Sequence, residues 1–170
     1  MLNKKFDKYV DEVIIENSRF CCVVLFSKRL VLVSAYFPND SNRKDQVSDE
    51  FLSLVDDLSC LFARFPNSSI VVGVDANVDF SRDNAHSKYF EVFCGYNDLS
   101  IARPSNATFK SGSIIDYFLV RGLCSVPPEV LSLSINPSDH NPLVVCLDFP
   151  FTVQPIMTSP KHKLTFTIND

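Results

Sequence analysis

Glycine and tryptophan are scarce in this sequence: its 170 residues include four glycines and no tryptophan. A loop that wraps a phosphate with its backbone usually needs several glycines in a short stretch, because side chains would block the close approach. Neither a Walker-type pattern nor a dinucleotide-binding pattern occurs. The sequence therefore argues against an enzyme built on a nucleotide-binding fold.

Metal-binding cysteine patterns and long apolar runs are also missing. The six cysteines show no CxxC and no Cys/His zinc spacing, so we expect most of them to be buried, structural and unreactive. Residues 1–9 are polar and do not form a signal peptide, and no apolar run approaches transmembrane length. These absences predict a reduced, intracellular, soluble protein with no membrane contact.

The sequence also has no excess of positive charge, since its formal net charge is −4. In residues 49–148, thirteen acidic side chains stand against six basic ones. A protein that binds DNA non-specifically usually carries a basic stripe, which this segment lacks. A cluster of carboxylates, however, is what Mg²⁺ requires. The charge leaves open both a weak DNA binder and a metal-dependent hydrolase.

The apolar pattern predicts one α/β domain of mainly antiparallel strands with helices outside. Residues 46–65 repeat apolar side chains at helical spacing, with Ser48 as the expected N-cap. A polar lead-in (1–18), a domain (19–149) and a proline-containing tail (150–170) divide the chain. Strands are predicted at 19–26, 30–37, 69–74, 107–110, 113–120, 130–135 and 143–147, and a second, short helix at 89–94.

Asp75 and Asn77 follow the buried strand 69–74 directly. Residues two apart at a strand end project to the same side of a sheet. A carboxylate and an amide placed there can activate a water and stabilise a developing oxyanion. The alternative is an Asx turn that only closes the strand.

Asp116 lies inside a strongly apolar strand, between Ile114 and Phe118. Burying a carboxylate there costs several kcal/mol unless it has a partner. His140, in Ser138–Pro142 (SDHNP), is the best partner among the three histidines, because Asp116 would orient the ring and stabilise the imidazolium. The alternatives are an Asp paired with backbone or water at a strand edge, and a surface His140.

Four motifs occur together in order: AYFPN at 35–39, GVDAN at 73–77, IDYF at 115–118 and SDHNP at 138–142. Their order and spacing resemble the endonuclease/exonuclease/phosphatase superfamily, also called deoxyribonuclease I-like. Residues 70–82 (IVVGVDANVDFSR) look most like the endonuclease domains of non-LTR retrotransposons. The resemblance implies a four-layer sandwich of two mainly antiparallel sheets flanked by helices.

The resemblance also implies roles for seven residues. Asp75 would activate the attacking water, Asn77 would stabilise the pentavalent phosphate, and His140, oriented by Asp116, would stabilise or protonate it. Tyr36 would contact the phosphate, Asn39 would bind substrate, and Asp139 would bind Mg²⁺ or Mn²⁺.

The function implied is Mg²⁺-dependent phosphodiester hydrolysis with DNA as the substrate. The chain would act as a monomer or as part of a polyprotein with a reverse transcriptase. The family's N-terminal part, which carries a metal-binding Glu, has no counterpart here, so we expect a truncated domain with weak activity. A small-molecule phosphatase and an inactive retroelement remnant are the alternatives.

Overall fold

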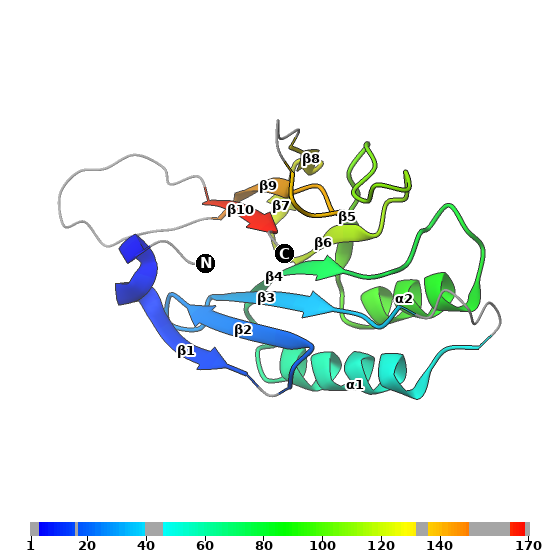
Figure 1. Ribbon diagram of the computed structural model, residues 1–170. Coiled ribbons are helices and arrows are strands. Elements are labelled where there is room, and N and C mark those ends of the chain that lie inside the picture. The colour runs from blue at the N-terminus through cyan, green and yellow to red at the C-terminus, as the bar shows by residue number, and fades with distance from the viewer. Residues whose placement is uncertain (1–3, 16, 40–45, 132–135, 150–163, 169–170) are drawn as a thin grey trace.

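Two β-sheets and two α-helices make up the fold of the computed structural model, which describes residues 4–15, 17–39, 46–131, 136–149 and 164–168 (Figure 1). The larger sheet has the strand order β1-β2-β3-β4-β6-β5, and its pairs are antiparallel except for the parallel pair β3–β4. The smaller sheet has the order β10-β9-β7, with β8 also paired to β9. A 3-10 helix, η1, precedes β1. The elements are η1 (Lys4–Tyr9), β1 (Val10–Ile14), β2 (Phe20–Leu25), β3 (Leu30–Tyr36), α1 (Asp49–Ala63), β4 (Ser69–Asp75), α2 (Ala85–Tyr96), β5 (Ser100–Ala102), β6 (Asp116–Arg121), β7 (Cys124–Ser125), β8 (Glu129–Val130), β9 (Leu143–Asp148) and β10 (Leu164–Ile168).

The central strands β4 and β6 of the larger sheet are buried on both faces, which explains their nearly continuous apolar sequences. On β4, Ile70, Val72 and Val74 belong to the core cluster that includes the buried sides of α1 and α2. Val71 belongs to the other cluster, which includes Leu143 and other β9 residues. Successive side chains of a strand point to opposite faces, so each face of β4 contributes to a different core. Figure 1 shows the helices on one side of this sheet and the smaller sheet on the other.

This arrangement confirms the predicted class, an α/β fold of two stacked sheets. The described residues supply three of the four expected layers, namely helices, larger sheet and smaller sheet. In the described part of the chain, both α-helices pack on the larger sheet.

Helix α1 begins as predicted and connects the two parallel strands. The Ser48 hydroxyl accepts a hydrogen bond from the Phe51 backbone N–H at 3.2 Å, and Asp49 and Glu50 occupy the first turn. A carboxylate is favourable there because unpaired N–H groups give this helix end a partial positive charge. The helix ends at Ala63, close to the predicted end at residue 65.

Two segments differ from the sequence prediction. Helix α2 spans 85–96 instead of 89–94. It starts earlier because Asn84 and Ser87 form a capping box, in which each side chain accepts from the other residue's backbone N–H, within a stretch that was predicted to be a polar loop. Residues 107–110 form an isolated bridge between Phe109 and His140 instead of a strand. The next strand starts at Asp116 because the Ser113 carbonyl is occupied by the backbone N–H groups of Thr108 and Phe109.

The predicted lead-in and tail both contribute strands. Residues 10–14 of the lead-in pair antiparallel with β2, since Val10 and Ile14 match Leu25 and Cys22 in register. In the tail, residues 164–168 pair with β9. Val130, the first residue of the predicted strand 130–135, belongs to β8. Residues 132–135 lie outside the described residues.

The described cysteines differ in burial, and Cys146 is intermediate. Cys22 and Cys94 are buried as predicted, whereas Cys21 and Cys60 are exposed, which corrects the expectation for these two. Burial raises the pKa of the Cys94 thiol to about 12, so it stays protonated and unreactive near neutral pH. Within the described residues, no helix has the length and apolar character needed to cross a membrane.

Candidate active site

Strand register brings three of the predicted site residues to one edge of the larger sheet. Asp75 is the last residue of β4, Asp116 is the first residue of β6, and the two are Cα partners in the antiparallel pair β4–β6. His140 arrives from the loop before β9, which belongs to the other sheet. The site therefore lies where the two sheets meet, and neither sheet could build it alone.

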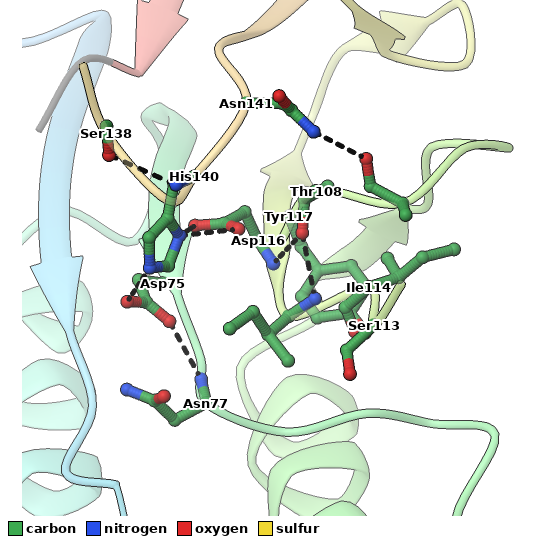
Figure 2. A network of polar contacts seen from close by, with 12 residues as sticks. Asp75, Asn77, Thr108, Ser113, Ile114, Asp116, Tyr117, Ser138, His140 and Asn141 are labelled. Carbon is green, nitrogen blue, oxygen red and sulfur yellow. Dashed lines mark hydrogen bonds and ion pairs between the residues drawn. The ribbon is translucent and has the colours of Figure 1, made fainter. Parts of the chain in front are cut away.

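His140 lies between the two carboxylates (Figure 2). Its Nδ1 is 3.2 and 3.1 Å from the two carboxylate oxygens of Asp116, and its Nε2 is 3.8 Å from Oδ2 of Asp75. A carboxylate can only accept, so Nδ1 carries the hydrogen and Nε2 faces Asp75. The side chains are 18%, 4% and 11% exposed for His140, Asp116 and Asp75. The predicted contact between Asp116 and His140 is present.

Thr108 holds the two halves of this contact together, and sequence reasoning missed it. It is fully buried, and its hydroxyl oxygen accepts from the backbone N–H groups of Ile115 and Asp116 at 3.0 and 3.2 Å. Its carbonyl accepts from the Asn141 N–H at 2.7 Å. One residue thus fixes the backbone at Asp116 and beside His140. A threonine in a predicted strand gave no signal of this role.

The Phe109 ring adds a second constraint on His140. The ring centroids are 4.9 Å apart with an interplanar angle of 67°, an edge-to-face arrangement. The backbone N–H of Lys110 donates to the Asp139 carbonyl at 2.9 Å, so the two loops are aligned along several residues. Packing and hydrogen bonding together restrict the ring to one orientation.

Replacing Thr108 with valine should lower the free energy of unfolding by about 1–3 kcal/mol, because two backbone N–H groups lose their acceptor without a change of shape. Urea denaturation measures this loss. Thr108→Ser is the matched control, since it keeps the oxygen, and it should lose clearly less. A loss for Thr108→Ser that is larger than the loss for Thr108→Val would show that the methyl group, and not the oxygen, mainly stabilises this position.

The Asx turn that was the structural alternative is present: the side chain of Asp75 accepts from the backbone of Asn77. The Asn77 backbone N–H donates to Oδ1 of Asp75 at 3.1 Å, and its Nδ2 donates to the Phe37 carbonyl at 2.8 Å. Its φ of +50° lies in the left-handed region, which asparagine tolerates better than most residues. An amide has two N–H donors, so one can still serve a substrate.

Tyr117 forms hydrogen bonds to loops on both sides of the site. The sequence did not indicate this role, as it did not indicate that of Thr108. The ring of Tyr117 is buried, and its hydroxyl lies 2.9 Å from the Val78 carbonyl and 2.5 Å from the Ile114 carbonyl. Burial raises the pKa of Tyr117 well above its usual range, so the hydroxyl stays a donor. Val78 follows Asn77 and Ile114 precedes Asp116, so the one hydroxyl connects the segments that carry both.

Tyr36 lies next to this cluster along the sheet, and Asn39 follows the end of β3. Tyr36 is the Cα partner of Asp75 in the parallel pair β3–β4 and is 47% exposed. Both residues line a hollow of about 450 Å³, together with Arg19, Pro38, Ser48, Asp49 and Glu50. The Arg19 guanidinium lies 5.5 Å from the centre of the Tyr36 ring and 2.7 Å from a Glu50 oxygen. Their predicted contacts with substrate stay predictions.

Asp139, the predicted metal ligand, is exposed and does not join the cluster. Among the described residues, one group of three or more His, Cys, Asp or Glu side chains has the spacing of a metal site: Asp75, Asp116 and His140, with ligand atoms within 4.8 Å of one another. Mg²⁺ prefers an all-oxygen, octahedral set of ligands. A group that includes a ring nitrogen does not fit that preference.

Several solved structures share the fold of this chain. An endonuclease/exonuclease/phosphatase family protein from Bacteroides thetaiotaomicron matches with a TM-score of 0.52 and 17% identity, over 75% of this chain and 52% of that one. A mannosyl-6-phosphatase from Bacteroides thetaiotaomicron matches with a TM-score of 0.52 and 18% identity, over 76% of this chain and 56% of that one. The chain has the endonuclease/exonuclease/phosphatase fold.

The catalytic domain of human Nocturnin has the same fold, with a TM-score of 0.51 and 13% identity over 83% of this chain and 60% of that domain. This chain thus spans between 52% and 60% of the length of these three proteins. No protein-family model and no curated protein matches the sequence. At such identities the likeness concerns the fold, and the activity has to be argued from the site.

Proposed function

We propose that this chain hydrolyses phosphodiesters in DNA, as an endonuclease of retrotransposon type. The observation that carries the proposal is the line of Asp116, His140 and Asp75 at the junction of the two sheets. It puts a base, an acid and the carboxylate that orients the acid within one cluster. The retroelement-like residues 70–82 support DNA as the substrate.

The chain's own residues can perform an in-line displacement. Asp75 takes a proton from a water whose oxygen forms a bond to phosphorus, while Asn77 donates a hydrogen bond to a non-bridging oxygen. His140, protonated at Nε2, gives that proton to the leaving oxygen as the phosphorus–oxygen ester bond breaks. Asp116 keeps the ring oriented throughout by accepting from Nδ1.

The distance between Asp75 and His140 also explains how the site returns to its starting state. After the displacement, Asp75 is protonated and His140 is neutral. Oδ2 of Asp75 and Nε2 of His140 are 3.8 Å apart, so the proton can pass from one to the other after a small movement or through one water. This transfer restores the base and the acid for the next turnover.

Mg²⁺ is part of the proposal, but the described residues give it no matching ligand set. A bound Mg²⁺ would neutralise charge on the phosphate oxygens. The carboxylates of the cluster are shared with His140, and the Asp139 side chain is outside it. We therefore propose that hydrolysis by this chain is slow.

A phosphatase acting on small molecules is the second candidate, and the hollow beside Tyr36 favours it. Its lining holds two acidic side chains, Asp49 and Glu50, against one basic side chain, Arg19. Each further phosphate of a DNA strand brings a negative charge, which such a lining repels. A neutral ring, such as the sugar of a sugar phosphate, does not meet this repulsion.

The test compares two substrates under one set of conditions. Purified wild-type chain is incubated with supercoiled plasmid and, separately, with mannose 6-phosphate, each with Mg²⁺ and with EDTA. His140→Gln, purified identically, reveals contaminating enzymes. We expect Mg²⁺-dependent nicking by the wild type and not by the variant.

The other outcomes decide against this proposal. Phosphate release from the sugar phosphate without nicking would establish the second candidate. Failure on both substrates, or equal nicking by His140→Gln, would identify the chain as an inactive remnant.

A further inference from the structure

Arg19 belongs to the row of residues that carries the candidate active site. The Tyr36 backbone N–H donates to the Arg19 carbonyl at 2.8 Å, which extends the antiparallel pairing of β2 with β3 by one residue. Tyr36 is the Cα partner of Asp75, and Asp75 is the Cα partner of Asp116. The ends of the neighbouring strands β2, β3, β4 and β6 therefore present, in this order, Arg19, Tyr36, Asp75 and Asp116 (Figure 1).

These four side chains also point to one face of the larger sheet. Each has a neighbour along the chain in the core cluster on the helix side, namely Phe20, Ala35, Val74 and Tyr117. Successive residues of a strand point to opposite faces, so the four face the smaller sheet, from which His140 arrives. Neighbouring strands are about 4.8 Å apart, which puts Arg19 roughly 10 Å along the row from Asp75. This is of the order of the distance between neighbouring phosphates of a nucleic acid strand.

Arg19 is held in place through both its backbone and its side chain. Its backbone N–H donates to the side-chain oxygen of Asn17 at 2.8 Å. Its guanidinium lies 5.5 Å from the centre of the Tyr36 ring, and its Nη2 is 2.7 Å from Oε2 of Glu50. A guanidinium has five N–H donors in a planar fork that matches phosphate oxygens, and a single contact does not use them all. Arg19 can therefore bind a second anion in the same orientation.

Glu50 lies where a phosphate oxygen would contact Arg19. The Glu50 side chain is 70% exposed, whereas that of Arg19 is 34% exposed. Ion pairs at the surface are weak, so the more exposed partner, Glu50, can turn into solvent when another anion takes its place. Both residues line the hollow of about 450 Å³ beside Tyr36, which is open to a ligand.

We propose that Arg19 binds the phosphate next to the one that is cleaved, and that Glu50 competes with this phosphate for the guanidinium. The inference rests on the proposed function, because it adds a second contact with the same substrate. Arg19 favours substrates with at least two phosphates, such as a DNA strand, while Glu50 keeps their affinity low. The acidic character of the hollow, which disfavours DNA, then depends on one side chain that can move.

Binding is measured on the whole chain by the fluorescence anisotropy of a short labelled single-stranded DNA, in EDTA so that no turnover is needed. We expect Glu50→Gln to tighten binding by up to about 5-fold, which is what a surface ion pair contributes. Arg19→Gln should weaken binding by about 10-fold, because a charged hydrogen bond to phosphate is lost. It should also lower the slope of log affinity against log salt by about 0.7, the value for one phosphate contact on a single strand.

Glu12→Gln is the matched control for the change of charge. Glu12 pairs with Arg64 at 3.5 Å, at the other end of α1 from Glu50. The same charge is removed from the same kind of pair, so a general electrostatic effect on DNA binding would appear in both variants. We expect Glu12→Gln to bind like the wild type.

The double variant Arg19→Gln/Glu50→Gln separates the two roles. If Glu50 acts through Arg19, its removal gains nothing once Arg19 is gone. Arg19→Lys keeps the charge but not the fork, should bind with intermediate affinity, and replaces Arg19→Gln in these comparisons if circular dichroism shows that the glutamine variant is unfolded.

Four results would each overturn the inference: no DNA binding by the wild type or by Glu50→Gln, an equal gain from Glu12→Gln, a gain from Glu50→Gln that persists without Arg19, or unchanged affinity and salt dependence in Arg19→Gln. The proposed function fails separately. The expected binding pattern in a chain that does not nick plasmid would refute hydrolysis alone, and nicking by a chain whose Arg19 variants bind normally would refute this inference alone.

Discussion

Replacing Asp75 with asparagine should slow phosphoester hydrolysis by about 10²–10⁴-fold, the usual contribution of a general acid or base. Asparagine keeps the shape and the oxygen that accepts from the Asn77 N–H. The substitution removes the carboxylate that takes a proton from water and later passes it to His140. The loss should appear in kcat, because the substitution removes a group that acts in the transition state.

The measurement is the initial rate of plasmid nicking, or of hydrolysis of an activated phosphodiester, with folding checked by circular dichroism. Asp79→Asn provides the matched control, since it makes the same chemical change four residues later, where Asp79 pairs with Arg82. Its rate should stay close to that of the wild type. A folded Asp75→Asn protein with undiminished activity would remove Asp75 from the mechanism.

Replacing Phe37 with alanine should cost about 3–5 kcal/mol of unfolding free energy, the largest stability change we expect in this chain. Phe37 is fully buried, and its ring centroid lies 4.9 Å from that of Phe51 and 5.2 Å from that of Phe90. It therefore joins the sheet to both helices. Because domains are stable by only about 5–15 kcal/mol, the variant should be close to unfolding.

Chemical denaturation measures this loss, and Phe37→Leu is the control because it keeps most of the apolar volume. We expect the leucine variant to lose clearly less stability. The Phe37 carbonyl, which holds Asn77, is unchanged in both variants. A loss below about 1 kcal/mol for the alanine variant would mean that the core refills the space, contrary to its dense packing.

The central strands and the first helix were predictable because their local signals agree with their tertiary surroundings. β4 is an unbroken apolar run because both of its faces are buried. The α1 prediction depended on one apolar stripe and a Ser48 cap, and both are present. Where periodicity, capping and burial indicate the same element, sequence alone identifies it to within a few residues.

Elements and contacts without a distinctive pattern in their own residues were not predictable. The edge strand β1 has no distinctive apolar pattern, since three of its five residues are exposed. It is a strand because β2 offers it a ladder of hydrogen bonds. Thr108 and Tyr117 likewise act on backbone groups that only the folded chain brings near.

That Asp116 needs a hydrogen-bond donor was determined by the sequence, because a carboxylate among isoleucine and phenylalanine has to be paired when it is buried, and His140 was the favoured partner. Which other group faces that histidine was decided by the tertiary structure. The register of β4 against β6 and the loop of the second sheet place Nε2 toward Asp75, while Asp139, one residue away, turns toward solvent. The reason is physical: desolvation is a local demand that composition reveals, whereas the distance between two loops depends on how whole sheets pack.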